Sequence, residues 1–144
     1  MSVWWLVRFF HVGAAILWVG GQLALSLIVR PAAATTLAPE DRTALFVEAG
    51  RRFGRVATLA LMPVLLASGL ALAWHRGVTL GSFTRPGYGS ILGTKVVLAL
   101  VSFGLAALHG LVATRGEATS TRWVGIAGVA VSSLVVLLAV SLVP

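Results

Sequence analysis

The sequence lacks cysteine altogether and contains two methionines among its 144 residues. Without cysteine the chain forms no disulfide, offers no thiolate to a metal and carries no CxxCH motif for attaching haem. Copper(I) favours soft sulfur ligands, and Met1 and Met62 are the two thioethers present. These absences exclude thiolate metal centres. They also leave few sulfur ligands for a path that would conduct copper.

Charged residues are also scarce, at 10% of the sequence, whereas 58% of residues are hydrophobic and the mean hydropathy is +0.99. A helix that crosses a bilayer needs about 20 consecutive apolar residues. Segments of this kind fill most of the chain and leave no room for a soluble domain: Val3–Val29, Phe53–Trp74, Ile91–Ala113 and Trp123–Val143. The composition predicts an all-α, polytopic membrane protein, a single four-helix transmembrane bundle over residues 1–144.

The net charge of +7 bears first on topology. Basic residues flank the first and third loops more densely than the second: Arg30, Arg42, Arg51, Arg52, Arg55, Arg115 and Arg122 against Arg76 and Arg85. By the positive-inside rule, loops one and three are cytoplasmic and both termini lie outside, in a bacterial-type inner (cell) membrane. Because the arginines lie at membrane edges, without groove-reading elements, we exclude nucleic acid as a partner.

The first loop has a pattern of its own. Arg30 and Pro31 are predicted to end the first helix. The following TTLAPEDRTALFVEAG then reads as a short amphipathic helix, with Pro39 in its first turn and Phe46 on its apolar side. We expect this helix to lie on the cytoplasmic membrane surface.

The third span carries polar residues along one helix face. Lys95, Ser102 and His109 are spaced by seven residues, and small side chains lie between them. A step of seven falls only about 20° short of two full turns. A charged side chain inside a membrane costs about 3 kcal/mol and is usually retained for function. The alternative is that Lys95 snorkels to the interface and His109 is a satisfied interfacial histidine.

The first span has a similar stripe formed by His11, Trp18 and Gln22. His11 lies about 12 Å inside the span at 1.5 Å per residue. An imidazole at that depth either binds a cofactor or metal or is a core histidine bonded to a neighbouring carbonyl. His75, at the end of the second span, is expected to be exposed and is a weak candidate.

Two further sets of residues admit alternatives. The second span opens with three arginines, Arg51, Arg52 and Arg55. They either fix the orientation of the span by the positive-inside rule or form a clamp that binds carboxylates or phosphate head groups. The fourth span has a stripe of small residues, interpreted as a packing face: Thr121, Gly125, Gly128 and Ser132.

Motifs in the first three spans resemble those of two related membrane families. The chain resembles the CopD copper-resistance membrane domain in FFHVGAAILWVGG, VRP, RRFGR, SGLALAW and TRPGYGSILGTKV. It is also similar to HemJ-type protoporphyrinogen oxidases, which share a histidine in the first span, an arginine pair and Met-Pro in the second, and a lysine and His-Gly in the third. Here these are His11, Arg51 with Arg52, Met62 with Pro63, Lys95, and His109 with Gly110. The first resemblance implies copper transport or tolerance, the second porphyrinogen oxidation.

Residue types favour haem b over copper as the cofactor. Haem b in a helical bundle needs histidine ligands, an apolar slot and cations for its propionates. The candidate metal ligands are His11 and His109, and the other cofactor-binding candidates are Lys95, Arg51, Arg52 and Arg55. His11 is roughly level with Lys95 and about 15 Å from the level of His109, so the two histidines cannot share one iron. We take His11 as the first choice of ligand, with Lys95 across the bundle.

The sequence thus predicts a haem b-binding membrane redox protein that transfers electrons, with porphyrinogen oxidation implied by the HemJ resemblance. Besides the lipid bilayer, such a protein implies a quinone or another redox partner, and it allows a homo-oligomer. The alternatives are a CopD-like copper transport or tolerance protein and a structural membrane subunit without a cofactor, packing through the fourth span.

Overall fold

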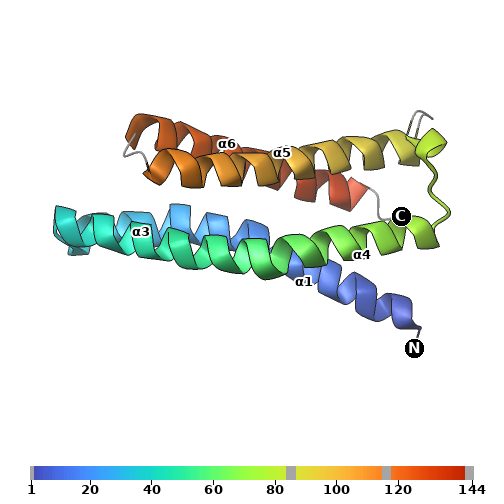
Figure 1. The fold of residues 1–144 in the computed structure, drawn as a ribbon, viewed down its shortest axis with the longest axis horizontal. Coiled ribbons are helices and arrows are strands. Elements are labelled where there is room, and N and C mark those ends of the chain that lie inside the picture. The colour runs from blue at the N-terminus through green and yellow to red at the C-terminus, as the bar shows by residue number, and fades with distance from the viewer. Residues whose placement is uncertain (1, 84–86, 115–117, 142–144) are drawn as a thin grey trace.

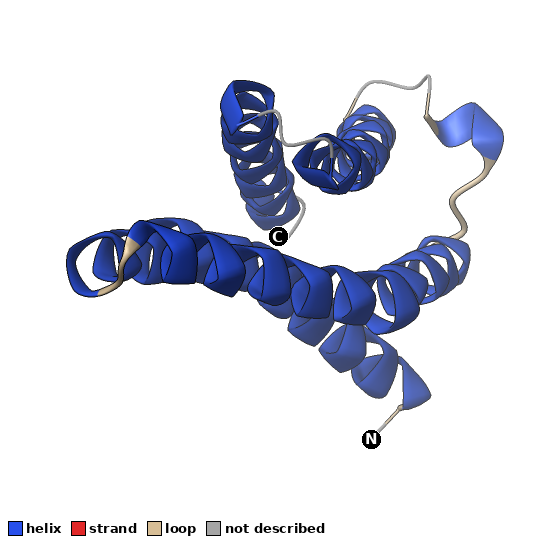
Figure 2. Ribbon diagram, turned by 60° about the vertical axis from the view of Figure 1, so that its left-hand side comes forward, coloured by secondary structure: helices blue, strands red, loops and turns tan. Residues whose placement is uncertain are grey.

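A computed structural model describes residues 2–83, 87–114 and 118–141 (Figure 1). Within these ranges the chain is helical apart from short turns, and no strand is formed (Figure 2). The elements are α1 (Val3–Ala24), η1 (Leu25–Val29), α2 (Arg30–Thr36), α3 (Pro39–Val56), η2 (Ala57–Leu61), α4 (Met62–His75), η3 (Leu80–Ser82), α5 (Tyr88–Thr114) and α6 (Ala118–Ser141). The predicted all-α class is confirmed.

Four continuous helical segments are long and apolar enough to cross a membrane: Val3–Thr36, Pro39–His75, Gly89–Val112 and Ser120–Val140. Their large apolar side chains face outward, as at Leu59 and Leu70, which are 73% and 72% exposed. A helix in a water-soluble protein would carry polar residues on that outer face. The chain is a multi-pass membrane protein, as the composition predicted.

The first two segments are longer than a bilayer requires. With 34 and 37 residues, they extend over about 51 Å and 56 Å, against a hydrocarbon core of about 30 Å. The prediction that Arg30 and Pro31 end the first helix is wrong, because the helix continues to Thr36. The amphipathic helix does begin at Pro39, but it runs directly into the second span. The α2–α3 hairpin therefore projects beyond the α5–α6 pair (Figure 1).

Two π-helical turns explain why the prolines do not end these helices. η1 and η2 each finish two residues before a proline, Pro31 and Pro63. A proline ring clashes with the carbonyl four residues earlier in an α-helix. Here the Arg30 and Met62 N–H groups donate to carbonyls five residues back, which widens the turn and accommodates the ring. The sequence shows the prolines but not these wider turns.

The helices pack as two antiparallel pairs. α1 packs against α4, and α5 packs against α6, with α1 also contacting α6 and α3 contacting α5. α1 and α5 begin, and α4 and α6 finish, at one end of the bundle, which is here named the terminal end; the other is the distal end (Figure 1). The buried centre contains Trp18, whose ring stacks on Phe53 and meets Phe103 edge-on, at centroid distances of 6.1 and 5.3 Å.

Adjacent glycines in α1 provide a test of this packing. A methyl group added at Gly21 would collide with the Phe53 ring, whereas one at Gly20 would meet no atom within 4 Å. Any shift of the Phe53 ring would disturb its stacking on Trp18. We expect Gly21→Ala to lower stability by about 1–3 kcal/mol, as overpacking usually does. Gly20→Ala should leave the thermal unfolding midpoint unchanged or raise it, and equal midpoints for the two variants would contradict the packing.

Candidate functional site

A polar network crosses the middle of the bundle and links three helices. The Trp18 indole donates to the Ser102 hydroxyl at 3.3 Å, and the Gln22 amide donates to the Ser132 hydroxyl at 3.3 Å. The two serine hydroxyls lie 2.6 Å apart. Ser102 and Ser132 are 2% and 1% exposed, the lowest values among the residues whose burial is described. Sequence analysis interpreted Ser132 as part of a packing face, but it also bonds α6 to α1 and α5.

This network fixes the relative heights of the helices. Trp18 on α1 and Ser102 on α5 are bonded and therefore level. His11 and Lys95 each lie seven residues nearer the terminal end on the same faces, so they are level with each other. His109 lies seven residues beyond Ser102 toward the distal end. At 1.5 Å per residue, the levels of the two histidines are about 21 Å apart, and they cannot bind one iron.

His11 is held by α4. Its Nδ1 lies 2.8 Å from the Ser68 hydroxyl oxygen, and the Ser68 hydroxyl donates its own hydrogen to the Val64 carbonyl. A serine has one hydrogen to donate, so its oxygen must accept from the histidine. This arrangement assigns a hydrogen to Nδ1 of His11, and the ring also lies within hydrogen-bonding reach of the Leu65 carbonyl. The ring also packs on Gly69, where an added methyl would lie 3.4 Å from Cε1.

Lys95 shares this part of the bundle. It is half-buried on α5 and lies at the level of His11, seven residues before Ser102. Arg76, which directly follows α4, acts electrostatically on Lys95. The structure therefore brings together two of the predicted site residues, His11 and Lys95, and adds Arg76, which the sequence analysis counted only among the basic residues flanking the second loop.

His109 lies apart from this group. Its side chain is exposed, and its ring packs over Gly125 of α6, where an added methyl would lie 3.2 Å from Cε1. His75 stacks on Trp4 at the terminal end, with centroids 3.8 Å apart. Among the described residues, no three His, Cys, Asp or Glu side chains gather as a metal centre would require.

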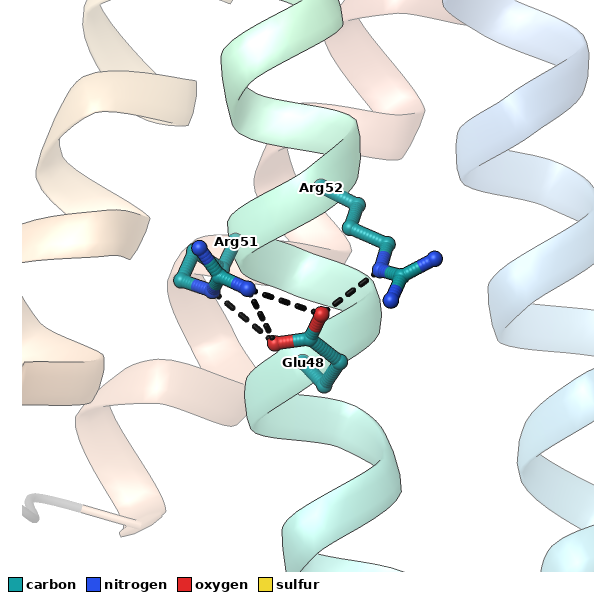
Figure 3. A network of polar contacts seen from close by, with 3 residues as sticks. All are labelled: Glu48, Arg51 and Arg52. Carbon is teal, nitrogen blue, oxygen red and sulfur yellow. Dashed lines mark hydrogen bonds and ion pairs between the residues drawn. The ribbon is translucent and has the colours of Figure 1, made fainter.

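Two of the arginines predicted to clamp an anion form ion pairs with a carboxylate of their own helix, α3. Arg51 donates to both Glu48 oxygens at 2.9 and 2.8 Å, and Arg52 donates to one of them at 2.6 Å (Figure 3). All three side chains are largely exposed. Arg55 is exposed and has no ion pair with any residue that the structure describes. Exposed pairs of this kind add about 0–1 kcal/mol to stability, which suits an anchor at the membrane edge.

Sequence analysis missed Ser68, which orients His11. The available signal was a single hydroxyl in an otherwise apolar stretch, followed by a glycine. A serine in a membrane helix commonly bonds to the carbonyl four residues earlier, so the sequence alone gives no reason to pair it with His11. The pairing depends on the register of α1 against α4.

Adjacent serines in α6 test the network. Ser132 is buried and bonded, whereas Ser133 is exposed. We expect Ser132→Ala to lower stability by about 1 kcal/mol, because Gln22 and Ser102 each lose a partner within the bundle. Ser133→Ala should leave it unchanged. Thermal unfolding in detergent, followed by circular dichroism, measures both, and equal midpoints would show that the network contributes nothing.

Comparison with known proteins yields a relative that matches nearly the whole chain. A protein of Aquifex aeolicus (strain VF5), described as an uncharacterized protein, is 33% identical over 141 residues, which cover 94% of this chain and 92% of the relative. The chain belongs to the family of this protein. Because the match covers nearly all of both chains, the family comprises the whole four-helix bundle rather than one hairpin. No protein-family model and no solved structure matches the chain.

Proposed function

We propose that the protein binds haem b in the membrane and transfers electrons, with His11 as an axial ligand through Nε2. The observation that supports this most directly is the orientation of His11 by Ser68. Metal-ligating histidines usually donate their other ring N–H to a fixed acceptor, which sets the tautomer and the ring orientation. The Nδ1 contact of 2.8 Å to a hydroxyl that already donates elsewhere supplies that arrangement.

The residues near His11 suit haem in two further respects. Gly69 and Ala14 place small side chains on the helix surfaces next to His11. Lys95 provides a cation at the same level of the bundle. Haem sites in helical bundles are built from inward-facing side chains of this kind. Bound haem would supply one-electron chemistry, while the protein would set its axial ligand, its orientation and its exclusion from water. A quinone or another redox protein would be the electron partner.

The geometry favours copper less. A Cu(I) site requires soft ligands, and Met62 packs against the buried hydrophobic cluster that contains Trp18 and Leu61. If the protein is an enzyme, the HemJ resemblance implies that the reaction is porphyrinogen oxidation. A CopD-like copper function and a structural subunit without cofactor are outcomes that the following measurement distinguishes.

The test is the cofactor content of the purified protein, expressed with both haem precursor and copper supplied. We expect about one haem b per chain by pyridine haemochromogen assay and copper well below one per chain. Stoichiometric copper without haem would support the CopD-like function. Neither cofactor would support the structural subunit, and either result would overturn the haem proposal.

We further propose a bacterial-type inner membrane location, with the distal end cytoplasmic and both termini outside. The arginines near the distal end support this orientation by the positive-inside rule. A reporter active only in the cytoplasm should be active when fused at Pro39 and inactive when fused at Val78 in the second loop. The reverse pattern would contradict the orientation.

A further inference from the structure

An apolar groove of about 660 Å³ runs along the outside of the bundle, between α1 and the part of the second segment formed by α3 and η2. Exposed side chains such as Ile16 and Leu17 border it, and the buried Leu61 lies along it. A methyl group added at Gly20 would meet no atom within 4 Å, so this part of the groove is open. Because an unfilled groove deprives its lining of dispersion contacts, an apolar ligand is favourable here.

The groove is charged at one end. Among the described residues that line it, Arg52 is the one with a charge. Arg52 immediately precedes the apolar stretch of the second span, on the distal side, and Leu61 lies nine residues further along. The two residues are therefore about 13 Å apart along the helix axis. A cationic mouth at the membrane edge with an apolar interior matches a lipid that has an anionic head group.

The Arg52 guanidinium retains donors for such a ligand. Its Nε donates to Glu48 at 2.6 Å, and its two terminal nitrogens point away from Glu48, toward the pale-blue ribbon of the first segment (Figure 3). Arg51, on the other side of α3, gives Glu48 both its Nε and a terminal nitrogen. A guanidinium commonly binds phosphate through two parallel N–H groups, and Arg52 has such a pair available.

The charge around the groove favours an anionic lipid over a second copy of the chain. Arg51, Arg52 and Arg55 share one carboxylate, Glu48, within residues 48–56, which leaves an excess of two positive charges. Basic clusters at a membrane edge attract anionic head groups. A symmetric pair of chains packed through this face would instead bring two Arg52 side chains to the same level, where like charges repel.

We propose that this groove binds one anionic phospholipid, with an acyl chain along Gly20 and Leu61 and the phosphate on Arg52. The inference goes beyond the proposed haem function and does not depend on it. The acyl chain fills the open space, and the head group offsets the excess positive charge. Arg52 is thereby assigned to a lipid phosphate rather than to a haem propionate.

The test is native mass spectrometry of the delipidated chain in detergent, titrated with phosphatidylglycerol or with phosphatidylcholine of the same acyl chains. We expect one tightly bound phosphatidylglycerol per chain, with an affinity at least about tenfold above that of phosphatidylcholine, the effect of one charge-assisted interaction. In Arg52→Gln this ratio should fall to about two or less. Glycerol phosphate, which has the anionic group without acyl chains, should not bind at the same concentrations.

Matched variants separate the groove from its surroundings. Gly20→Leu places a side chain in the groove and should weaken phosphatidylglycerol binding at least about tenfold. Gly104→Leu adds the same side chain at an open position of α5 and should not. Arg51→Gln removes the same charge as Arg52→Gln, but from the other side of α3 (Figure 3), and should retain the preference for phosphatidylglycerol. Circular dichroism checks that each variant is folded.

Four results would overturn the inference. An equal loss of preference in Arg51→Gln and Arg52→Gln would show general attraction between charges rather than a site. Unchanged binding in Gly20→Leu would show that the groove takes no part, and binding of glycerol phosphate alone would show a site for free phosphate. A wild-type dimer that dissociates in Gly20→Leu, without preference for phosphatidylglycerol, would assign this face to a second copy.

Discussion

Replacing His11 with alanine should abolish the haem spectrum of the purified protein. Among the contacts of the described residues, His11 is the histidine whose Nδ1 bonds to a hydroxyl within the bundle, and the proposal assigns Nε2 as its ligating atom. Without it, no other histidine lies at the level of Lys95, because His109 is about 21 Å away along the bundle axis. We expect haem content to fall at least about tenfold, corresponding to 1.4 kcal/mol or more, with helicity unchanged by circular dichroism.

The other two histidines serve as controls. His75 stacks on Trp4 at the helix end, and His109 packs over Gly125, so His75→Ala and His109→Ala should retain the spectrum. A His11→Gly variant leaves space for free imidazole, and adding imidazole should restore the Soret band if His11 acts as a ligand. An unchanged spectrum in His11→Ala, together with loss in His109→Ala, would move the site to the distal end.

Replacing Ser68 with alanine should weaken haem binding by about 10–100-fold, the usual effect of removing the partner that orients a ligating histidine. The Ser68 oxygen accepts the Nδ1–H of His11, and without it the ring can rotate or take the other tautomer. Because the hydroxyl also bonds back to Val64 within its own helix, its loss should affect the fold little.

Ser68→Thr is the matched variant, since threonine keeps the hydroxyl and can make the same bond to the preceding turn. We expect it to retain most of the affinity. Haem titrations of both variants, with thermal unfolding measured alongside, separate a role in orientation from one in folding. If Ser68→Ala binds haem as the wild type does, Ser68 has no part in positioning His11.

Much of the fold follows from composition, but the helix boundaries do not. Long apolar segments with few charges can hardly form anything other than membrane helices, and the four spans were predicted on that basis. The continuation through Pro31 could not be predicted, because it depends on a wider turn at Leu25–Val29. The same is true of the fusion of the Pro39 helix with the second span through Ala57–Leu61.

The candidate site was partly accessible to sequence reasoning. Residue spacing alone placed His11 near the level of Lys95 and far from His109, because a helix has a constant rise. The partner of His11 could not be found in this way. Ser68 lies on α4 and His11 on α1, and the register between these two helices is set by packing. Residue spacing also does not show whether an arginine is already paired with a carboxylate of the protein, as Arg51 is with Glu48.

The visible absorption spectrum of the purified wild-type chain, recorded oxidised and then after reduction with dithionite, tests the central claim most directly. We expect a Soret band that shifts on reduction and the sharpened visible bands of a b-type haem, absent from His11→Ala prepared in the same way. A wild-type chain that shows no haem absorption when haem is supplied in excess would contradict the account.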